Sequence, residues 1–433
     1  MSSYDKITPP TKGEKVTKDS SGKLVVPDNP IIPYIAGDGI GPEIMEAMRK
    51  VVDAAVKKAY SGKKEIAWFE IFAGEKARKI YAAEYSDEQL GKLDPTVLRD
   101  LYLPKDTLKA IVDHVIAIKG PLTTPIGGGF RSLNVAIRQK LDLYSCIRPA
   151  KHIKGVPAPV KKPEDVNMVI FRENIEDVYS GVEFEPESED AKKLISFINN
   201  EFGKGVLMES GIGIKPMSWA NTSRLVRMAI NYAFDKGFDK VTLVHKGNIM
   251  KFTEGKFKDW GYKLAAKEFS DKVISEKEVF DKHDGKIPAG KVMINDRIAD
   301  SMFQQILLRP AEYGVLALPN LNGDYISDAL AAQVGGLGFA PGANVGDNAA
   351  VFEATHGTAP KHAGLNKVNP GSVIYSAIMM LEYMNWNEAA EIINTGVEKA
   401  IAQKKVTYDL ARQLGDVEPI GTSEFADAII SNL

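Results

Sequence analysis

Cysteine is almost missing from this chain, and neither sign of charge is in excess. Its 433 residues include one cysteine, Cys146, which excludes an internal disulfide framework and any site built from several thiolates. Lysine and arginine total 55 against 57 aspartate and glutamate, a formal net charge of -2. This balance gives no electrostatic case for binding nucleic acid. A lone cysteine is typical of a buried thiol in a reducing compartment, and we therefore expect a cytoplasmic protein.

Long apolar runs are also missing. No stretch has the unbroken apolar length of a membrane span, so no membrane partner is expected. The first thirty residues are polar and charged, without the apolar core of a signal peptide, and predict a loosely held arm over 1–30. With 44% hydrophobic residues, the rest of the chain can bury enough surface for more than one domain.

Apolar strand-like runs alternate with helical patterns from residue 31 onward. Such runs lie at 31–37, 65–74, 113–120, 167–171, 241–247 and 313–320. The alternation predicts an α/β architecture with an at least partly parallel sheet. Residues 183–194 are acidic and then helical, which suggests an insertion lying off the main sheet, and the glycine-rich stretch 334–346 is the best candidate for a crossing between domains.

The stretch G-D-G-I-G-P begins like a dinucleotide fingerprint. Its glycines fall at 37, 39 and 41, but the third fingerprint position is Pro42, which lacks the N–H that a phosphate would use. Glu70 lies well beyond the expected spacing of about 20 residues. A tight turn carrying a strand into a helix, with proline in its first turn, is the favoured interpretation.

Polar and cationic residues gather between Lys119 and Pro149. Ser132 stands near a predicted helix start, and Asn134 and Arg138 lie one turn apart on one face. Arg148 and Arg172 lie at the ends of apolar runs. Each arginine alone is more typical of a solvated surface charge, whereas together with the Ser/Thr-rich helix start they would suit a polycarboxylate. The sequence leaves both readings open.

An acidic group follows further along the chain. In N-G-D-Y-I-S-D, Asp324 and Asp328 face the same way if a helix starts at Gly323. Because like charges at that spacing repel, a cation between them would explain the arrangement, with Asp300 as a third ligand. Oxygen ligands favour Mg²⁺ or Mn²⁺. The alternative is that Asp324 caps the helix and Asp328 is simply exposed.

A third stretch, E-A-T-H-G-T-A-P-K-H-A-G-L-N-K-V-N-P-G-S from Glu353, mixes small residues with two histidines. Such a loop can wrap a planar heterocycle. His356 alone would carry little weight, since a lone histidine is more often structural.

Five motifs together resemble one known family. They are G-P-L-T-T-P-I-G-G-G, R-S-L-N-V-A-I-R-Q, V-H-K-G-N-I-M-K-F-T-E-G, N-L-N-G-D-Y-I-S-D and F-E-A-T-H-G-T-A-P. The chain is similar to the NADP-dependent isocitrate dehydrogenases of the homodimeric bacterial and archaeal type, within the β-decarboxylating dehydrogenases. The resemblance covers nearly the whole chain and leaves out only the N-terminal arm.

This resemblance implies a fold. An isocitrate/isopropylmalate dehydrogenase-like fold, not a Rossmann fold, has large and small α/β domains that share a mixed sheet and a clasp-like insertion. Carried onto this chain, the boundaries are 1–30 for the arm, 31–143 and 335–433 for the large domain, 144–176 and 219–334 for the small domain, and 177–218 for the clasp at the dimer interface.

The resemblance also implies roles for single residues. Those expected to hold isocitrate are Thr124, Ser132, Asn134, Arg138, Arg148 and Arg172. The metal ligands would be Asp324 and Asp328, with Asp300 from the neighbouring subunit, and the catalytic pair Tyr179 and Lys246, the lysine also crossing the dimer. The cofactor contacts would be Thr123, His356, Gly357, Thr358, Ala359, Pro360, Lys361, His362, Asn369, Tyr408 and Arg412.

The implied activity is a metal-dependent reaction of the tricarboxylic acid cycle. Isocitrate would be oxidised and decarboxylated to 2-oxoglutarate and carbon dioxide as NADP is reduced, in a homodimer whose subunits share active sites. Lys361 and Arg412 favour the NADP phosphate, since NAD-preferring members usually carry an acidic residue at the lysine position. His362 stands where many bacterial relatives have tyrosine, so one phosphate contact is altered.

Three alternatives remain. A 3-isopropylmalate or homoisocitrate dehydrogenase belongs to the same family, but Ser132 and Asn134 suit a carboxylate better than an isopropyl group. A catalytically silent regulatory subunit is disfavoured because the acids, the tyrosine and the lysine are all present. A phosphoryl-transfer enzyme is disfavoured by the lack of a G-x-x-x-x-G-K-[ST] motif.

Overall fold

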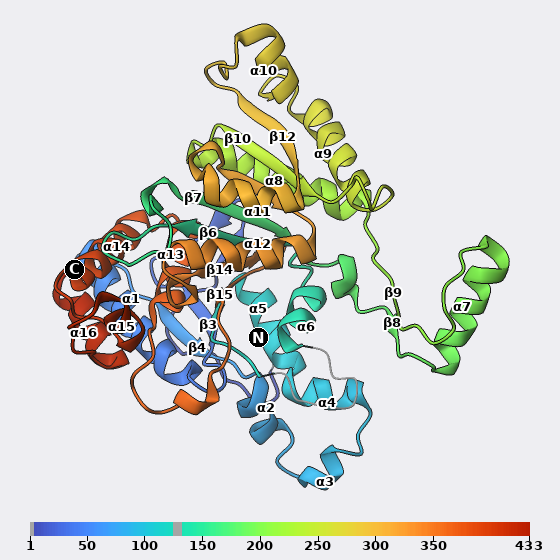
Figure 1. Cartoon of the computed structure of the whole chain (residues 1–433). Helices are drawn as coiled ribbons and strands as arrows, with labels where there is room; N and C mark the ends of the chain where they lie inside the picture. Colours follow the sequence, from blue (N-terminus) through green and yellow to red (C-terminus); the bar gives the residue numbers. More distant parts are fainter. Residues whose placement is uncertain (1–3, 124–131) are drawn as a thin grey trace. The chain divides into compact units, whose positions relative to one another are not determined.

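The computed structural model of the chain describes residues 4–123 and 132–433 (Figure 1). It consists of two compact units. Unit 1 comprises Met1–Ile170, Ile306–Glu312 and Ser327–Leu433, and unit 2 comprises Phe171–Gln305 and Tyr313–Ile326. In the part of the chain that is described, no helix combines the length and the apolar character needed to cross a membrane.

Unit 1 contains a mixed sheet. In hydrogen-bonding order its strands are β6 (Ser145–Lys151), β14 (Pro341–Val345), β15 (Ala350–Ala354), β5 (Ile116–Lys119), β3 (Ile31–Ile35) and β4 (Ala67–Glu70). β15, β5, β3 and β4 run parallel, whereas β14 is antiparallel to both of its neighbours. The predicted α/β architecture with a partly parallel sheet is confirmed.

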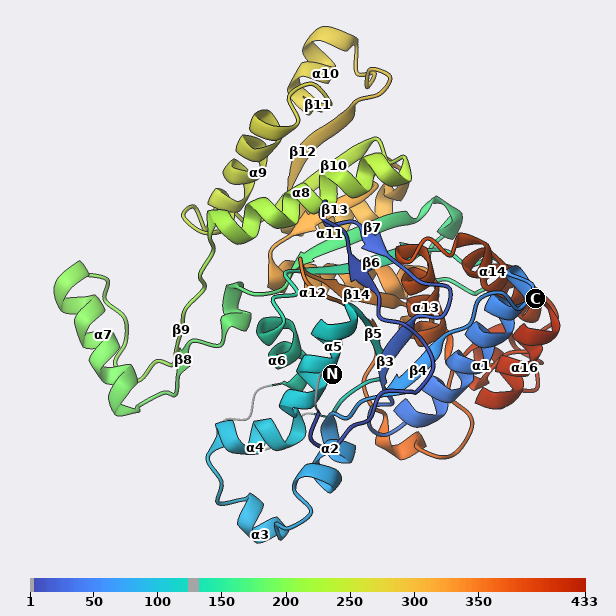
Figure 2. The same cartoon turned by 180° about the vertical axis from the view of Figure 1, so that it is seen from behind.

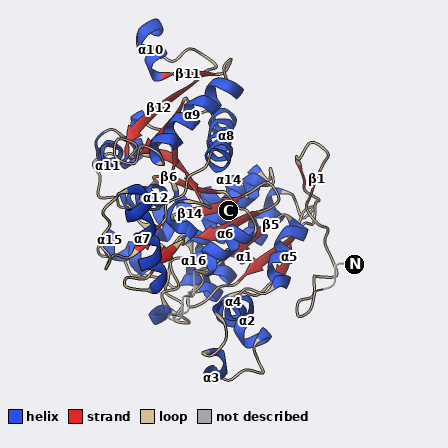
Figure 3. Cartoon of the chain, turned by 90° about the vertical axis from the view of Figure 1, so that its right-hand side faces the viewer, coloured by secondary structure: helices blue, strands red, loops and turns tan. Residues whose placement is uncertain are grey.

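Helices surround these strands (Figure 3). The C-terminal helices α13 (Gly371–Tyr383), α14 (Asn387–Ala402) and α16 (Thr422–Ser431) pack with α1 (Gly41–Ala59), as Figures 1 and 2 both show. In α1 the buried residues include Ile44, Met48, Val51 and Val52, the three- and four-residue spacing of an amphipathic helix. Burying each such side chain contributes roughly 1.5–3 kcal/mol. The other helices of this unit's N-terminal and C-terminal parts are α2 (Gly74–Tyr81), α3 (Asp87–Leu90), α4 (Pro95–Tyr102), α5 (Lys105–His114), α6 (Leu133–Lys140) and α15 (Tyr408–Leu414).

The N-terminal segment is held more firmly than the sequence suggested. The backbone N–H groups of Asp5 and Lys6 donate to the carboxylate of Asp106, and Ile7 and Val16 are buried. A short hairpin, β1 (Thr17–Lys18) and β2 (Leu24–Val25), follows. The prediction of a loosely held arm is therefore wrong for residues 4–30. Two isolated apolar residues anchor it, and these leave no periodic pattern in a polar sequence.

The turn after β3 confirms the interpretation of the glycine-rich stretch. Gly37 and Gly39 have φ of 88° and 58°, and Pro42 lies in the first turn of α1. A Cβ on Gly39 would stand 2.1 Å from the carbonyl oxygen of Thr358, which also accepts a hydrogen bond from Ile40 N at 3.0 Å. The turn therefore packs directly against the loop after β15, without space for a side chain at position 39.

Unit 2 is built around strands in the order β11 (Val273–Ser275), β12 (Val292–Ile298), β10 (Lys240–His245), β13 (Val315–Leu318) and β7 (Asn167–Glu173). The first four run parallel. The helices that follow or flank them are α8 (Trp219–Lys236), α9 (Glu254–Glu268), α10 (Glu276–His283), α11 (Ala299–Leu308) and α12 (Asn320–Gln333).

An arm projects from unit 2. It contains η2 (Asp177–Ser180), β8 (Glu183–Phe184), α7 (Glu189–Phe202) and β9 (Ile212–Gly213), and β8 and β9 form a separate two-stranded antiparallel sheet. Both Figure 1 and Figure 2 show α7 (green) set apart from the other helices of its unit. Phe197, Phe202 and Leu207 on this arm are more than half exposed, at 55%, 61% and 65%. Such a surface is typical of one that another protein covers.

Candidate active site

In unit 2, three of the residues picked out from the sequence form one hydrogen-bonded group. Arg172, at the end of β7, is buried and its Nη1 lies 2.6 Å from Asp324 Oδ1. The Tyr179 hydroxyl donates to Asp324 Oδ2 at 2.5 Å, and the arginine lies 4.8 Å from the tyrosine ring centre. Burial and the hydrogen bond to Asp324 raise the pKa of Tyr179, so its hydroxyl keeps its proton and can donate it.

The helix that carries these aspartates begins earlier than expected. α12 starts at Asn320 rather than Gly323, so Asp324 lies inside the helix and does not cap it. The Nε of Arg172 donates to both the carbonyl and the side-chain oxygen of Asn320, at 2.8 and 2.9 Å. A Cβ on Gly323 would stand 2.5 Å from the Cγ of Arg172, which explains a glycine on this helix. The alternative is therefore wrong for Asp324, which does not cap the helix, and right for Asp328, whose side chain is 57% exposed.

Within unit 1, a second arginine contacts the part of α12 that begins at Ser327. Arg148 Nη1 donates to Ser327 Oγ at 2.7 Å and lies 3.4 Å from Asp328 Oδ1. Asp324 and Asp328 are four residues apart on α12, and each is paired with one arginine. The carboxylates are thus balanced by cations of the chain itself.

Lys246 and Asp300 form a separate pair in unit 2. Lys246 follows β10, Asp300 lies in the first turn of α11, and Nζ and Oδ1 are 2.5 Å apart. The hydrogen bond from Lys246 lowers the pKa of Asp300. Within the described residues of one chain, no three carboxylate, histidine or cysteine side chains stand together as a metal site. Asp300 therefore pairs with the lysine and does not join the α12 aspartates.

The helix α6 carries the remaining residues expected to bind carboxylates. Ser132 is its N-cap residue, and Asn134 and Arg138 lie within the helix. The Oδ1 of Asn134 is buried and has no hydrogen-bond partner among the described residues. A bound ligand that donated to it would remove the cost of leaving it unpaired. Thr124 lies outside the described residues.

Arg138 also belongs to a buried ionic network that the sequence did not reveal. Its Nη2 lies 2.7 Å from Glu353 Oε1, which accepts from Asn344 Nδ2 at 2.8 Å. Lys119 Nζ donates to Glu353 Oε2 at 2.9 Å. Burial alone would raise the pKa of Glu353, but the charges of Lys119 and Arg138 hold it well below the ordinary value. The only sequence signal was a charge at the end of each of two apolar strands.

The loop after β15 carries most of the expected cofactor residues. It comprises His356, Gly357, Thr358 and Ala359, then the short helix η5 (Pro360–His362), which includes Lys361. Ala359 has a left-handed backbone, with φ of 36°. Burial is the main cause that lowers the pKa of His356, with a further contribution from the charge of Lys119. His356 is therefore neutral at physiological pH, with Nδ1 placed to donate to the Gly357 carbonyl at 3.0 Å.

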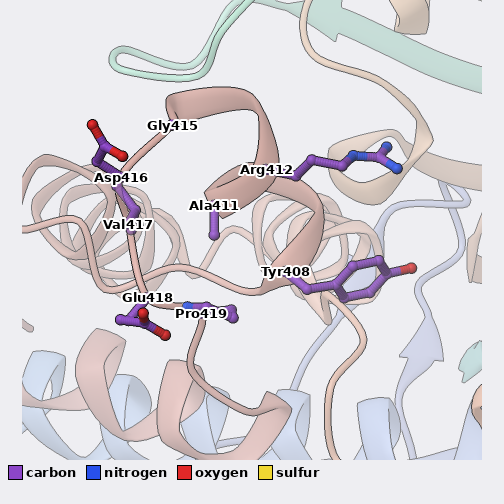
Figure 4. Close-up of a pocket in the computed structure, with 8 residues that line it drawn as sticks. All are labelled: Tyr408, Ala411, Arg412, Gly415, Asp416, Val417, Glu418 and Pro419. Carbon is purple, nitrogen blue, oxygen red and sulfur yellow. The ribbon is translucent and has the colours of Figure 1, made fainter.

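A cationic group lies where this loop meets α15. The rings of His362 and Tyr408 are 5.9 Å apart, and Lys367 Nζ lies 5.0 Å from the Tyr408 ring centre. Figure 4 shows the side chains of Tyr408 and Arg412 extending to the same side of α15. They help to line a cavity of about 620 Å³, whose other lining residues are Ala411, Gly415, Asp416, Val417, Glu418 and Pro419. The cations make this part of unit 1 suited to an anion such as a phosphate.

Two further contacts fix the surroundings of this loop. Asn369 donates to Asp409 Oδ2 at 2.9 Å and accepts from Gly371 N at 2.8 Å, so its side chain is already held between α13 and α15. Thr123 N donates at 2.8 Å to Asp38 Oδ2 in the glycine-rich turn. Asp38 was not recognised from the sequence. Its only sequence signal is its place between two glycines, Gly37 and Gly39, which have positive φ in the structure.

The structure thus combines an α/β fold with a helix, α12, whose two aspartates are each paired with an arginine from a strand. Comparison with known protein families agrees with this arrangement. The model of the isocitrate/isopropylmalate dehydrogenase family matches residues 31–429, and the chain belongs to this family. It is 55% identical over 430 residues to the protein named Isocitrate dehydrogenase [NADP] of Archaeoglobus fulgidus, with 99% of each chain covered. Its identity to the protein of the same name from Pseudomonas aeruginosa is 55% over 434 residues, covering 99% of this chain and all of the relative.

A solved structure supports the same assignment. The crystal structure of isocitrate dehydrogenase from Methylococcus capsulatus is similar with a TM-score of 0.72 and 35% identity, and covers 93% of this chain and 98% of that one. The family and the fold class expected from the sequence motifs are therefore confirmed.

Proposed function

We propose that this protein oxidises and decarboxylates isocitrate to 2-oxoglutarate and carbon dioxide while it reduces NADP. The observation that carries the proposal is helix α12, on which Asp324 and Asp328 stand four residues apart and each faces an arginine. The relatives with about 55% identity over the full length are named isocitrate dehydrogenases, which favours this substrate over 3-isopropylmalate or homoisocitrate.

The substrate carboxylates are proposed to bind to arginines whose side chains already have fixed partners in the chain. Arg148 and Arg172 are already oriented by Ser327 and Asn320, so their side-chain freedom is largely lost before isocitrate arrives. Glu353 orients Arg138 in the same way. The buried Asn134 amide suits a polar group of the substrate rather than an apolar one. The full proposed set is Thr124, Ser132, Asn134, Arg138, Arg148 and Arg172.

The carboxylates of Asp324 and Asp328 are proposed to hold Mg²⁺ or Mn²⁺, with Asp300 supplied by a second copy of the chain. Their oxygen donors suit a hard divalent ion, and the guanidinium groups now beside them mark positions where positive charge is favourable. When bound, such an ion would polarise the substrate hydroxyl and stabilise the negative charge that develops on its oxygen.

The proton transfers are assigned to Lys246 and Tyr179. Lys246, as a neutral amine that has left its pair with Asp300, would take the proton of the substrate hydroxyl as hydride leaves for NADP, which produces a β-keto acid. The departure of carbon dioxide leaves an enolate, and the Tyr179 hydroxyl gives a proton to its carbon and becomes a phenolate. The hydrogen bond from the Tyr179 hydroxyl to Asp324 at 2.5 Å supports this role, because it holds the proton beside a proposed metal ligand.

NADP is proposed as the cofactor because of the cations around Tyr408. The proposed contacts are Thr123, His356, Gly357, Thr358, Ala359, Pro360, Lys361, His362, Asn369, Tyr408 and Arg412. Lys361, His362 and Arg412 would surround the 2′-phosphate, which NAD lacks. The left-handed Ala359 helps turn the loop so that its small residues can approach a planar base closely.

A homodimer in the cytoplasm is the proposed form of the protein. The exposed phenylalanines of the arm support a partner that covers them, and the arm 177–218 would be the clasp between subunits. The remaining proposed boundaries are 1–30, then 31–143 with 335–433 for a large domain and 144–176 with 219–334 for a small one. The lone, buried Cys146 fits a reducing compartment.

One assay tests the proposal. The purified chain is mixed with Mg²⁺, a candidate substrate and either NADP or NAD, and absorbance of the reduced nicotinamide is followed. We expect turnover with isocitrate and NADP, and little with 3-isopropylmalate or homoisocitrate. Turnover with 3-isopropylmalate alone would overturn the substrate, and isocitrate binding without turnover would instead indicate a regulatory subunit.

A further inference from the structure

Three charged residues are buried together in unit 2 at the base of the arm. Asp177, Lys215 and Glu254, here called the anchor cluster, have side chains that are 1%, 16% and 1% exposed. The Nζ of Lys215 lies 3.0 Å from Glu254 Oε1 and donates to Asp177 Oδ1. No step of the proposed reaction uses any of them. Burying three charges is costly unless each is satisfied, so their contacts indicate what they hold in place.

Glu254 connects the proposed proton acceptor to the aspartate helix. Its Oε2 accepts from the backbone N–H of Lys246, in the turn after β10, and from Asn322 Nδ2 at 2.8 Å. Asn322 lies on α12, two residues before Asp324. One carboxylate at the first position of α9 therefore fixes both the turn of Lys246 and the first part of α12. A carboxylate at a helix N-terminus is itself stabilised by the helix dipole.

Asp177 makes a second connection to the same helix. Its Oδ2 accepts from Leu321 N on α12 at 3.1 Å, and its own N–H donates to Pro216 O at 3.1 Å. Asp177 has φ of 67°, a conformation that a non-glycine residue adopts only when its surroundings hold it. Asp177 and Pro216 stand at the two ends of the arm, and Tyr179 follows Asp177 by two residues. The cluster thus closes the base of the arm against α12.

We propose that Asp177, Lys215 and Glu254 are positioning residues for the reaction, which hold Lys246, Tyr179 and Asp324 in place on their own elements, the lysine for the site of the second copy, and make these positions depend on the seating of the arm. The inference rests on the proposed roles of these three residues. The physical argument is one of geometry, because the cluster accepts hydrogen bonds from the Lys246 turn and from α12, and Asp177 precedes Tyr179 by two residues. Small displacements of such groups cost large factors in rate, up to about 10²-fold for 1 Å.

The test compares Lys215→Met with Lys204→Met, an exposed lysine of the arm. In Lys215→Met we expect kcat with isocitrate to fall roughly tenfold or more, with NADP affinity within about twofold of the wild type. NADP affinity is the control because its proposed contacts lie in unit 1. Lys215→Arg should restore much of kcat, since it returns the charge.

Two readouts separate positioning from general stability. The backbone N–H of Lys246 should exchange with solvent at least tenfold faster in Lys215→Met and in Asn322→Ala than in Lys204→Met, because its acceptor Glu254 is no longer fixed. The pH profile of kcat should also shift in both variants. Asn322→Ala removes only the hydrogen bond from α12 to Glu254 and leaves the ion pairs of Lys215 intact. If Lys215→Met does not fold, the kcat and the exchange rate of Asn322→Ala test the proposal.

Each outcome is informative. A folded Lys215→Met or Asn322→Ala with kcat, exchange at Lys246 and pH profile equal to those of Lys204→Met would overturn the inference, while the wild type stayed active. A wild type without isocitrate turnover would overturn the proposed function, and the exchange measurement would still report whether Glu254 holds the Lys246 turn.

Discussion

The guanidinium of Arg172 lies 2.6 Å from the carboxylate of Asp324, and the arginine side chain is 2% exposed whereas the aspartate is 33% exposed. The buried Arg172 is thus paired with a carboxylate that is partly accessible to solvent. The arginine is fixed on its inner side by Asn320 and cannot follow the aspartate if the latter moves. The geometry of Arg172 is therefore set before any ligand binds.

Replacement of Arg172 by lysine should mainly weaken substrate binding. Lysine keeps the charge but loses the fork that contacts Asn320 and Asp324 together. Loss of one or two charge-assisted bonds, each worth about 1.5–3 kcal/mol, predicts a fall in kcat/KM for isocitrate of roughly 10–100-fold. Steady-state kinetics measure this effect, with the exposed Arg309→Lys as control. Equal kcat/KM values in the two variants would contradict a role in substrate binding.

Arg412→Met should change the choice of cofactor. The Arg412 side chain leaves α15 on the same side as Tyr408, whose ring centre lies 5.0 Å from Lys367 Nζ. Without its charge, kcat/KM for NADP should fall roughly tenfold or more, because a charge-assisted contact to phosphate is worth about 1.5–3 kcal/mol. The value for NAD should stay nearly constant. The exposed Lys405→Met is the matched control, and a parallel loss with both cofactors would argue against a contact to the 2′-phosphate.

Glu353→Gln should destabilise unit 1. The variant leaves Lys119 and Arg138 buried without their carboxylate, and breaking a buried pair in this way costs about 3–5 kcal/mol. The lowered pKa of Glu353 means that the stabilising contribution is present above the ordinary carboxyl pKa and is lost as pH falls through the folded-state value. Urea unfolding at neutral and acidic pH measures both effects. The exposed Glu391→Gln should behave like the wild type.

Glu173 should give the protein a loss of stability with rising pH. Burial raises the pKa of Glu173 to about 7, against the hydrogen bonds from Ile175 N and Glu176 N. Between the ordinary glutamate pKa of 4.5 and about 7, the unfolded chain releases the proton while the folded chain retains it. The free energy of unfolding therefore decreases across this range and levels off above it.

Glu173→Gln tests this dependence. The variant should remove roughly 1–3 kcal/mol of the difference in unfolding free energy between pH 5 and pH 8, whatever its absolute stability. Chemical denaturation at several pH values measures the slope, and the exposed Glu185→Gln serves as control. An unchanged slope in Glu173→Gln would show that the carboxyl ionises normally in the folded protein.

Local patterns predicted the helix that carries the two aspartates. Asp324 and Asp328 were picked out by their four-residue spacing, and the helix does place both within α12. The start of that helix was misjudged by three residues, because the turn before Gly323 is held by Arg172 and Asp177 and not by a local cap. Helix ends fixed by distant side chains leave no signal in the neighbouring sequence.

Long-range pairs were beyond the reach of the sequence. Arg138 and Glu353 are 215 residues apart, and Glu254 reaches Asn322 across 68 residues. Both acids lie at the end or start of ordinary elements, where a solvated carboxylate is the usual finding. Their burial follows from the packing of several elements around them, which no single stretch of sequence specifies.

The contact between Gly39 and Thr358 has a consequence for how this chain can tolerate mutation. Any side chain at position 39 would meet a carbonyl oxygen at 2.1 Å, whereas a side chain at Gly62, which shares a positive φ, would meet nothing within 4 Å. In a library of variants selected in cells whose growth requires this enzyme to reduce NADP, we expect position 39 to retain glycine alone and position 62 also to accept asparagine. Gly39 is not a proposed cofactor contact, yet the position of the Thr358 carbonyl in the cofactor loop requires a glycine there.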